Sequence, residues 1–283
     1  MPELPEVETV RRGLNSVIAL QETPTIVGGE VLLPGTIAGG SKEFFLSGLQ
    51  GQALVTWHRR GKYLLCQLSR GGVLGVHLRM TGRLLWQSSK NPVGKHTRVR
   101  LFIAGERELR FDDQRTFGKM WYVPPAIPVT EVISGLKSMG AEPLSAEFTP
   151  AYLQHKLHRS HRPIKTVLLD QTVVAGMGNI YTDEALFISC IHPMTSAEAL
   201  SENQISRLHG AIVAVLQEGL KFGGTTFSNF HDINGRQGNY LNQAWVFRRH
   251  GQPCHVCQTP IQRLKIGGRS THYCPQCQST QGN

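Results

Sequence analysis

The cysteines near the end of the chain place the strongest constraint on the fold. Cys254 and Cys257 form one pair and Cys274 and Cys277 a second, with two residues inside each pair and 16 between the pairs. Four thiolates at this spacing can enclose one Zn²⁺ tetrahedrally and leave no open coordination position. We therefore predict one structural zinc ion. Free or redox-active CxxC pairs are the weaker interpretation, because both pairs share one spacing.

The residues between the two cysteine pairs are expected to form a β-hairpin. Residues 261–265 and 271–273 read as its strands, and Gly267-Gly268-Arg269 joins them. Arg263, Lys265 and Arg269 would then lie on one basic finger. Such a finger can reach into a groove of nucleic acid, and the competing interpretation is a solvated basic turn.

The start of the chain, Met1-Pro2-Glu3-Leu4-Pro5-Glu6, is the second feature with chemical content. A small residue after the initiator usually allows removal of Met1, which would leave Pro2 as a terminal secondary amine. A neutral amine can attack an electrophilic sugar carbon and form an iminium, which suits cleavage of a base–sugar bond followed by strand elimination. Glu3 could move protons in these steps, and Glu6 could do the same or hold the terminus. The competing interpretation is that both carboxylates only complement a helix dipole.

Charge and composition narrow the class of protein. The net charge of +10 over 283 residues suits a polyanionic partner, although generally basic proteins share this property. No run of about 18 apolar residues exists, so we expect no membrane span. The acidic start lacks an apolar signal region, which argues against secretion. Zinc-spaced thiols indicate a reducing compartment, and Cys66 and Cys190 lie in apolar surroundings and are expected to be buried. Together with the two motifs, the charge points to an enzyme that acts on nucleic acid.

The first half of the chain predicts an antiparallel sandwich or barrel. A helix is expected at the start, where Leu4, Val7, Val10 and Leu14 recur at helical spacing. Short β-rich segments then follow one another without helices between them, bounded by Gly, Pro or charge. These expected strands are residues 27–33, 53–58, 63–68, 73–77, 99–103, 109–112 and 120–123.

From about residue 130 the pattern becomes helical. Thr149-Pro150 and Pro163 are expected to open helices, the second reaching residue 169. Gly176-Met177-Gly178-Asn179 interrupts the pattern, which resumes over residues 180–188. Ser201-x-x-Gln204 resembles a capping box for a further helix that ends at Gly223-Gly224. Residues 225–243 are polar and rich in Gly and Asn, and a loop of this length is usually functional or mobile.

Several motifs, in one order along nearly the whole chain, resemble the formamidopyrimidine-DNA glycosylase and endonuclease VIII family of DNA-repair enzymes, and within it the oxidised-purine branch. They are Pro2-Glu3-Leu4-Pro5-Glu6, Arg59-Arg60-Gly61-Lys62-Tyr63-Leu64, His77-Leu78-Arg79-Met80-Thr81-Gly82, Asp113-Gln114-Arg115-Thr116-Phe117-Gly118, Gly176-Met177-Gly178-Asn179-Ile180-Tyr181, Gly223-Gly224-Thr225-Thr226 and Gly268-Arg269-Ser270-Thr271.

The resemblance implies an α+β protein of two domains. Residues 1–130 would form a catalytic antiparallel β-sandwich flanked by helices, and residues 131–226 a helical domain with the helix–two-turn–helix motif. Residues 227–243 would be a lesion-sensing loop, and residues 244–283 a zinc-ribbon hairpin module. The resemblance further implies a monomer that acts on the nucleoid DNA of a bacterial cytoplasm, with no membrane contact.

The family pattern also implies roles for the chemically active residues. Pro2 matches the Schiff-base nucleophile, Glu3 the acid that protonates the opening sugar, and Glu6 a residue that orders the site. Lys62 matches a lysine that contacts phosphate and assists β-elimination, although by itself it reads as a surface strand lysine. Arg269 matches the finger arginine that binds phosphates beside the lesion and is linked to δ-elimination.

A damaged nucleotide must leave the base stack before its anomeric carbon is accessible, and the resulting void must be filled. Met80, Arg115 and Phe117 match the family's void-filling residues: two apolar wedges and a guanidinium that can hydrogen-bond the orphaned cytosine. The competing interpretation places Met80 and Phe117 in the core and Arg115 on an ordinary surface. Thr116 replaces an arginine seen in many members, which would soften phosphate affinity.

Further DNA contacts follow from the family pattern alone. Asn179 matches an asparagine that touches backbone phosphate, where the Gly-Met-Gly turn lets N–H groups approach an anion. His96 matches a DNA contact. His161 stands where the family often has lysine or arginine. Lys165 matches a lysine that faces the site.

The leading hypothesis is a bifunctional base-excision repair enzyme. It would act as a DNA glycosylase on 8-oxoguanine opposite cytosine and on formamidopyrimidines, and as a lyase at the abasic site. The endonuclease VIII branch, which prefers oxidised pyrimidines, is the nearest alternative; Leu4 and the set of Met80, Arg115 and Phe117 argue against it. A zinc-ribbon nucleic-acid-binding protein without catalysis is the second alternative, against which the combination of Pro2, Glu3, Lys62 and Arg269 argues.

Overall fold

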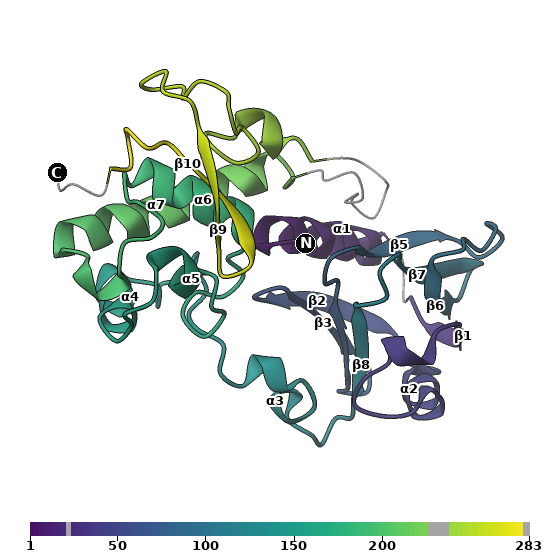
Figure 1. Ribbon diagram of the computed structural model, residues 1–283. Helices are drawn as coiled ribbons and strands as arrows, with labels where there is room; N and C mark the ends of the chain where they lie inside the picture. Colours follow the sequence, from purple (N-terminus) through teal and green to yellow (C-terminus); the bar gives the residue numbers. More distant parts are fainter. Residues whose placement is uncertain (21–23, 226–237, 280–283) are drawn as a thin grey trace. The chain divides into compact units, whose positions relative to one another are not determined.

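The computed structural model describes residues 1–20, 24–225 and 238–279 and divides the chain into two compact units (Figure 1). The first unit comprises Met1–Ser138 with Gly223–Gly238, and the second Met139–Phe222 with Asn239–Asn283. Among the described helices, none is both long and apolar enough to cross a membrane.

Two four-stranded sheets form the framework of the first unit. One has the strand order β1-β6-β7-β5 and the other β2-β3-β4-β8, and every pairing in both is antiparallel. The strands are β1 (Ile26–Val31), β2 (Leu54–Arg60), β3 (Tyr63–Leu68), β4 (Val73–His77), β5 (Gly82–Ser88), β6 (Thr97–Ile103), β7 (Arg107–Asp113) and β8 (Lys119–Val123). The predicted antiparallel sandwich is therefore confirmed.

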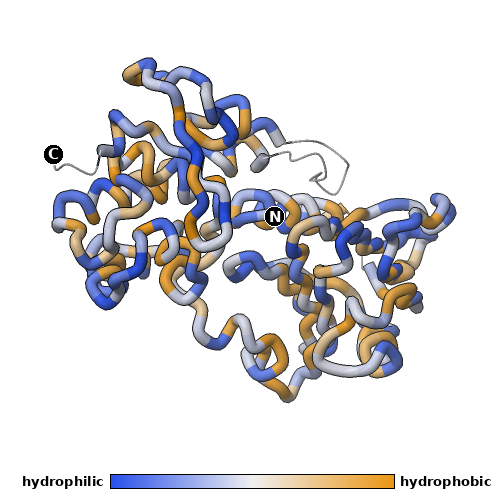
Figure 2. The backbone as a smooth tube through the Cα atoms, viewed as in Figure 1, coloured by the Kyte–Doolittle hydropathy of each residue, from blue (hydrophilic) through white to orange (hydrophobic). Residues whose placement is uncertain are grey.

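One hydrophobic core joins the two sheets and the helices α1 (Leu4–Ala19) and α2 (Lys42–Leu49). In β6 the buried residues Thr97, Val99, Leu101 and Ile103 alternate with half-buried ones, which is the period of a strand with one face against a core. Helix α1 buries the apolar stripe that its sequence predicts. Hydrophobic and hydrophilic segments accordingly alternate along the tube in Figure 2.

The sequence patterns do not predict two elements of the first unit, β5 and α2. Strand β5 lies directly after the Met80 motif, and its half-buried residues Leu85 and Trp86 blur the two-residue period. Helix α2 is capped by the Ser41 hydroxyl, which accepts from Phe44 N at 3.1 Å. Its Phe44 is 43% exposed, so the apolar residues of this short helix do not form one clean stripe.

The second unit is helical and carries a two-stranded hairpin. Its helices are α4 (Pro150–Leu157), α5 (Ile164–Leu168), α6 (Asn179–Ile188) and α7 (Glu202–Lys221), and its strands are β9 (Gln262–Ile266) and β10 (Arg269–Tyr273). The predicted caps are confirmed, since Thr149 accepts from Tyr152 N and Ser201 forms a capping box with Gln204. This unit also has the short helices η3 (Ala197–Ala199) and η4 (Tyr240–Gln243), and the first unit has η1 (Pro34–Thr36), α3 (Val129–Val132) and η2 (Ser134–Leu136).

Candidate active site

The start of helix α1 carries the candidate nucleophile. Pro2 and Glu3 are both buried, and Glu6 Oε2 accepts from Glu3 N at 2.8 Å. Burial lowers the pKa of the Met1 amino group, and the nearby Glu3 and Glu6 carboxylates, which raise it, do not reverse that shift. A lower pKa leaves more of a terminal amine deprotonated at neutral pH, and the deprotonated form is the nucleophile.

Positive charges also lie near the amino terminus. The Lys62 and Arg115 side chains both lower the pKa of the terminal amino group through their charges. The first unit therefore brings together four of the predicted residues, which come from three separate segments of the sequence. These are the start of α1 with Glu3 and Glu6, the turn after β2 with Lys62, and the segment after β7 with Arg115.

Glu6 is a positioning residue in this arrangement. Its Oε1 accepts from both Thr225 N at 2.6 Å and Thr225 Oγ1 at 2.9 Å, and its Oε2 holds the Glu3 amide. Gly224 has φ +82°, and a Cβ there would stand 2.8 Å from Glu6 Oε1. The Gly-Gly-Thr segment thus approaches the carboxylate closely because it has no side chain at Gly224.

The turn that presents Lys62 is tied to helix α1. Glu8 on α1 accepts from Arg59 Nε at 3.3 Å, and Arg59 Nη1 donates to the Gly61 carbonyl at 3.0 Å. Lys62 itself is buried, with 5% exposure. The Glu8–Arg59 pair therefore fixes the lysine turn to helix α1, which begins two residues after Pro2.

The predicted void-filling residues are at the surface. Met80 is 42% exposed and Phe117 50% exposed, which excludes the interpretation that they are core residues. The Arg115 guanidinium lies over the Phe117 ring, 5.0 Å from its centroid. Thr116 between them has φ +59°, a left-handed conformation that is uncommon outside glycine. Large apolar side chains held in solvent are available to contact a ligand.

His96 lies at the start of β6, one residue before Thr97, and is half-buried. Its carbonyl accepts from Asp113 N at 2.9 Å, so its main chain is fixed to the end of β7. Its ring contacts Arg98 Nη2 at 3.5 Å. The structure therefore places an imidazole and a guanidinium side by side, which is an arrangement suited to an anionic partner.

Lys165 is a buried member of an ion pair in the second unit. Its side chain is fully buried, its Nζ pairs with Asp183 Oδ1 at 2.6 Å, and it donates to the Ser270 carbonyl at 3.1 Å. In this structure the Lys165 ammonium is therefore engaged in supporting the hairpin. A contact of Lys165 with DNA stays a prediction.

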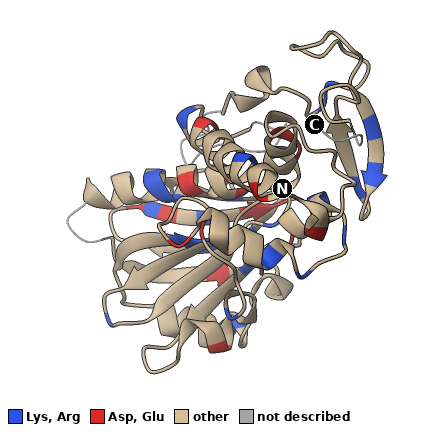
Figure 3. Cartoon of the chain, turned by 90° about the vertical axis from the view of Figure 1, so that its left-hand side faces the viewer, with Lys and Arg blue, Asp and Glu red and all other residues tan. Residues whose placement is uncertain are grey.

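The hairpin is anchored to helix α6 beside Arg269. Asn179 Nδ2 donates to the Ser270 carbonyl at 2.9 Å, the same oxygen that Lys165 holds. Asp183 Oδ2 accepts from His272 N at 2.9 Å. Arg269 is exposed next to the Gly267-Gly268 turn, and Figure 3 shows basic residues along this hairpin. The position of Arg269 is set by the hydrogen bonds to Ser270 and His272, which follow it in β10.

The remaining predicted contact, His161, is exposed, and its ring pairs with the Glu198 carboxylate. The pairing gives the imidazole an acidic neighbour, whereas a lysine or arginine at this position would carry a permanent positive charge. His161 is therefore expected to attract an anion less strongly than a lysine or arginine would at this position.

The four cysteines form a metal site. Their Sγ atoms all lie within 4.8 Å of one another, with Cys257 and Cys274 at 3.4 Å and Cys254 and Cys277 at 3.9 Å. A tetrahedron with Zn–S bonds of about 2.3 Å has sulfur–sulfur edges of about 3.8 Å. Backbone N–H groups of Val256 and Cys277 point at cysteine sulfurs at 3.4 Å. The donor set fits one structural zinc ion, which would close this module without taking part in chemistry.

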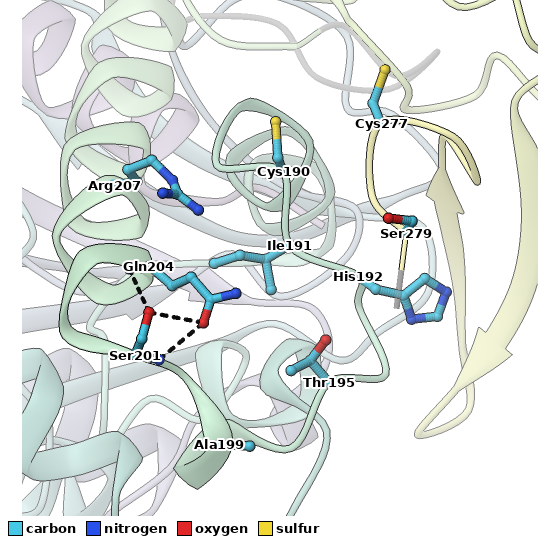
Figure 4. Close-up of a pocket in the computed structure, with 10 residues that line it drawn as sticks. All are labelled: Cys190, Ile191, His192, Thr195, Ala199, Ser201, Gln204, Arg207, Cys277 and Ser279. Carbon is cyan, nitrogen blue, oxygen red and sulfur yellow. Dashed lines mark hydrogen bonds between the residues drawn. The ribbon is translucent and has the colours of Figure 1, made fainter. Parts of the chain in front are cut away.

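The prediction that Cys190 is buried is wrong, whereas Cys66 is buried. Cys190 has φ +57° after the end of α6 and lines a pocket of the second unit together with His192, Arg207 and Cys277 (Figure 4). The left-handed turn directs the chain away from the helix, so an apolar sequence context did not place this side chain in the core. None of the predicted DNA contacts lines this pocket.

Replacing Lys165 by methionine tests the buried pair. The substitution keeps the length of the side chain but leaves the Asp183 carboxylate buried with one strong partner fewer. Breaking a buried pair from one side costs about 3–5 kcal/mol, so we expect a loss of this size in the free energy of unfolding of the zinc-loaded protein. Denaturant titration measures it.

Lys221→Met, at the exposed end of α7 in the same unit, is the matched control and should change the free energy of unfolding by at most about 0.5 kcal/mol. Adding Asp183→Asn to Lys165→Met should recover part of the loss, because the buried charge is then gone. Equal effects of Lys165→Met and Lys221→Met would contradict the assignment.

The structure also adds residues that sequence reasoning did not single out. Thr225 holds Glu6, Arg59 holds the lysine turn, and Asp183 anchors the hairpin. The sequence does contain an indication for Asp183, because a charged residue inside the apolar run 180–188 suggests a buried ion pair. Asp113 and Thr225 lie within motifs of the family resemblance, but the resemblance assigns neither residue a role.

The chain matches three family models. They are the formamidopyrimidine-DNA glycosylase N-terminal domain over residues 1–120, the formamidopyrimidine-DNA glycosylase H2TH domain over residues 139–231, and a zinc finger found in FPG and IleRS over residues 251–280. Among curated relatives, the formamidopyrimidine-DNA glycosylase of a Synechococcus strain is 56% identical over 282 residues, covering 98% of this chain and 99% of the relative. That of Trichodesmium erythraeum is 54% identical over 302 residues, covering 98% and 100%.

The solved structures to which the chain is similar include members of the same family. The chain is similar to Lactococcus lactis FPG in complex with DNA that contains an oxidised pyrimidine, with a TM-score of 0.89, 35% identity, and coverage of 99% of this chain and 100% of that one. It is also similar to the Lactococcus lactis protein bound to DNA with an abasic site, with a TM-score of 0.89, 35% identity, and coverage of 98% and 100%.

Proposed function

The chain belongs to the formamidopyrimidine-DNA glycosylase family, and on that premise we propose that it is a base-excision repair enzyme for duplex DNA. It removes oxidised purines, 8-oxoguanine and formamidopyrimidines, and then nicks the strand at the abasic site that it has made. The observation that carries the proposal is the buried Pro2, with the buried Glu3 beside it and Lys62 near the terminal amino group.

The first chemical step is displacement of the damaged base. After removal of Met1, the Pro2 nitrogen attacks C1′ of the sugar with its lone pair. The N–C1′ bond forms and the bond from C1′ to the base breaks, with the base taking up a proton as it leaves. The sugar ring opens when its ring oxygen takes a proton from Glu3, and the product is an iminium between Pro2 and C1′.

Strand cleavage follows from the iminium. The cationic nitrogen withdraws electrons, so a C2′ proton is lost and the 3′ phosphate leaves in β-elimination. A second elimination releases the 5′ phosphate, and water frees Pro2. Lys62 and Arg269 are proposed to hold the phosphates that leave, because a cation lowers the energy of the developing charge. The expected product is a one-nucleoside gap with phosphorylated ends.

The exposed residues supply the rest of the interface. Met80, Arg115 and Phe117 are proposed to fill the void left by the extruded nucleotide, and their exposure supports this role. His96, Asn179 and, less strongly, His161 are proposed to contact the DNA backbone. Asn179 would have to exchange or share its Ser270 hydrogen bond to do so.

The proposal extends to the organisation of the chain. Residues 1–130 are proposed to carry the covalent chemistry, and residues 131–226 and 244–283 to hold DNA, the last with one structural Zn²⁺. Residues 227–243, proposed to sense the lesion, lie largely outside the described residues. The chain is further proposed to act as a monomer on the DNA of a bacterial cytoplasm.

Product analysis tests this function. The protein is incubated with a duplex that contains 8-oxoguanine opposite cytosine, and in parallel with a dihydrouracil duplex and an undamaged duplex. We expect released 8-oxoguanine and a gap with two phosphorylated ends, and little product from the other two. Preferential release of dihydrouracil would move the protein to the oxidised-pyrimidine branch. Binding without any release would favour the non-enzymatic alternative.

A further inference from the structure

Two surface loops carry the proposed void-filling residues, and both leave the same end of one strand pair. Met80 and Thr81 directly precede β5, which begins at Gly82, and Arg115 to Phe117 follow β7, which ends at Asp113. Gly82 and Asp113 are register partners in the β5–β7 ladder. The loops therefore start side by side, at the point where the ladder hydrogen bonds stop.

The Asp113 carboxylate bridges these two loops. Its Oδ1 accepts from the Thr81 hydroxyl and from Arg115 N, the latter at 3.3 Å, and its Oδ2 accepts from Gly118 N at 2.7 Å. Thr81 Oγ1 in turn accepts from Arg115 N at 3.0 Å. One buried carboxylate, 2% exposed, thus holds the residue after Met80 and both ends of the Arg115–Phe117 turn.

The main chain of Asp113 extends the bridge to a third segment. Its N–H donates to the His96 carbonyl at 2.9 Å, and its carbonyl accepts from Arg98 Nε at 2.8 Å. The residue before β6 is therefore fixed to the same point. Four proposed DNA contacts, His96, Met80, Arg115 and Phe117, all lie within three residues of an atom that Asp113 holds.

The loops need such a bridge because their backbones are not relaxed. Arg79 has φ +53° and Thr116 φ +59°, which are left-handed conformations for residues with side chains. Gly118 and Gly82 are packed closely, since a Cβ would stand 2.4 Å from a Phe111 ring atom and from the Leu78 carbonyl respectively. Strained conformations persist only where surrounding contacts over-determine them.

We propose that Asp113 is the positioning residue that fixes the two loops to each other, so that Met80, Arg115 and Phe117 enter the base stack as one preformed unit. The inference rests on the proposed function, because it concerns how the void is filled. Without the carboxylate, the Thr81 hydroxyl and Gly118 N lose their acceptor, and Arg115 N keeps only the Thr81 hydroxyl, so the two loops are no longer held at one fixed point. Filling the void then requires ordering both loops during binding, which slows extrusion of the damaged base.

The test compares a substrate that has a void with one that has none. Asp113→Ala is assayed in single turnover for release of 8-oxoguanine opposite cytosine in a duplex. It is also assayed for nicking of a single-stranded oligonucleotide with a preformed abasic site, where no stack must be opened. We expect duplex excision to fall by about 100-fold, the scale of a misplaced reacting group, and single-strand nicking to stay at the wild-type rate. 2-Aminopurine beside the lesion should report slower unstacking.

Conservative variants guard against a mere failure to fold. Thr81→Val removes the hydroxyl that bridges Asp113 and Arg115 N and should reproduce part of the defect, while Thr81→Ser should restore it. Asp112→Asn alters the preceding buried carboxylate, which accepts from neither loop in the described residues, and should leave both assays unchanged. Equal loss of both activities in Asp113→Ala, or wild-type excision and unstacking in Asp113→Ala and Thr81→Val, would overturn the inference. Absence of release and nicking by the wild-type protein would instead overturn the proposed function.

Discussion

Replacing Pro2 by glycine is expected to reduce release of 8-oxoguanine by a factor on the order of 10³ or more, the scale of removing a residue that forms the covalent bond. The proline nitrogen is a secondary amine held in a ring, so its bond to C1′ is an obligate iminium cation. Glycine offers a primary amine with free torsion about its Cα, whose imine can lose its charge. Single-turnover assays of base release on the 8-oxoguanine duplex measure the effect.

Binding should separate chemistry from folding in this variant. Pro2→Gly is expected to hold a duplex with an uncleavable abasic analogue as tightly as the wild-type protein, because the DNA contacts lie elsewhere. Pro5→Ala perturbs the same first turn of α1 without touching the amine and should keep base release. Undiminished release and nicking by Pro2→Gly would show that Pro2 is not the nucleophile.

Loss of zinc is the second large expected effect. Zinc contributes about 10 kcal/mol or more to the folding of small zinc modules, so Cys274→Ser should unfold the hairpin β9–β10. Arg263, Lys265 and Arg269 then lose their fixed positions. We expect affinity for duplex DNA to fall about tenfold or more, the equivalent of about 1.4 kcal/mol or more. Metal analysis and fluorescence anisotropy with labelled duplex measure the two quantities.

Cys190→Ser is the matched control in the same unit. Cys190 is exposed and is not a member of the four-cysteine group, so this variant should bind one zinc ion per chain and retain wild-type DNA affinity. Full affinity and activity of metal-free Cys274→Ser would contradict the role given to the zinc module. Zinc loss from Cys190→Ser would contradict the ligand set.

The sequence predicts those parts of the fold in which a local pattern has one physical cause. Alternation in β6, the capping box at Ser201 and the cysteine spacing each encode one element, and the structure has all three. Strand β5 was missed because half-buried Trp86 and its neighbours weaken the alternation. The exposure of Cys190 is not predictable from its neighbours, because it depends on a turn that local hydrophobicity does not encode.

In the candidate site too, local patterns predict some residues, whereas others depend on partners far away in the sequence. Pro2, Glu3 and the cysteines could be singled out because their chemistry lies in consecutive or regularly spaced residues. The burial of Lys165 depends on Asp183, 18 residues away, and on the Ser270 carbonyl, 105 residues away. The bridging role of Asp113 depends on Thr81, 32 residues earlier. Such partners become visible only when the chain has folded.

Borohydride trapping is the direct test of covalent catalysis by the amino terminus. Protein shown by mass spectrometry to begin at Pro2 is mixed with borohydride and a duplex that carries 8-oxoguanine opposite cytosine, and the adduct is digested and sequenced. We expect a reduced adduct in high yield, with the sugar remnant on the Pro2 nitrogen, and far less from a dihydrouracil duplex. An adduct on a lysine, or base release without any trapped adduct, would contradict this role of Pro2.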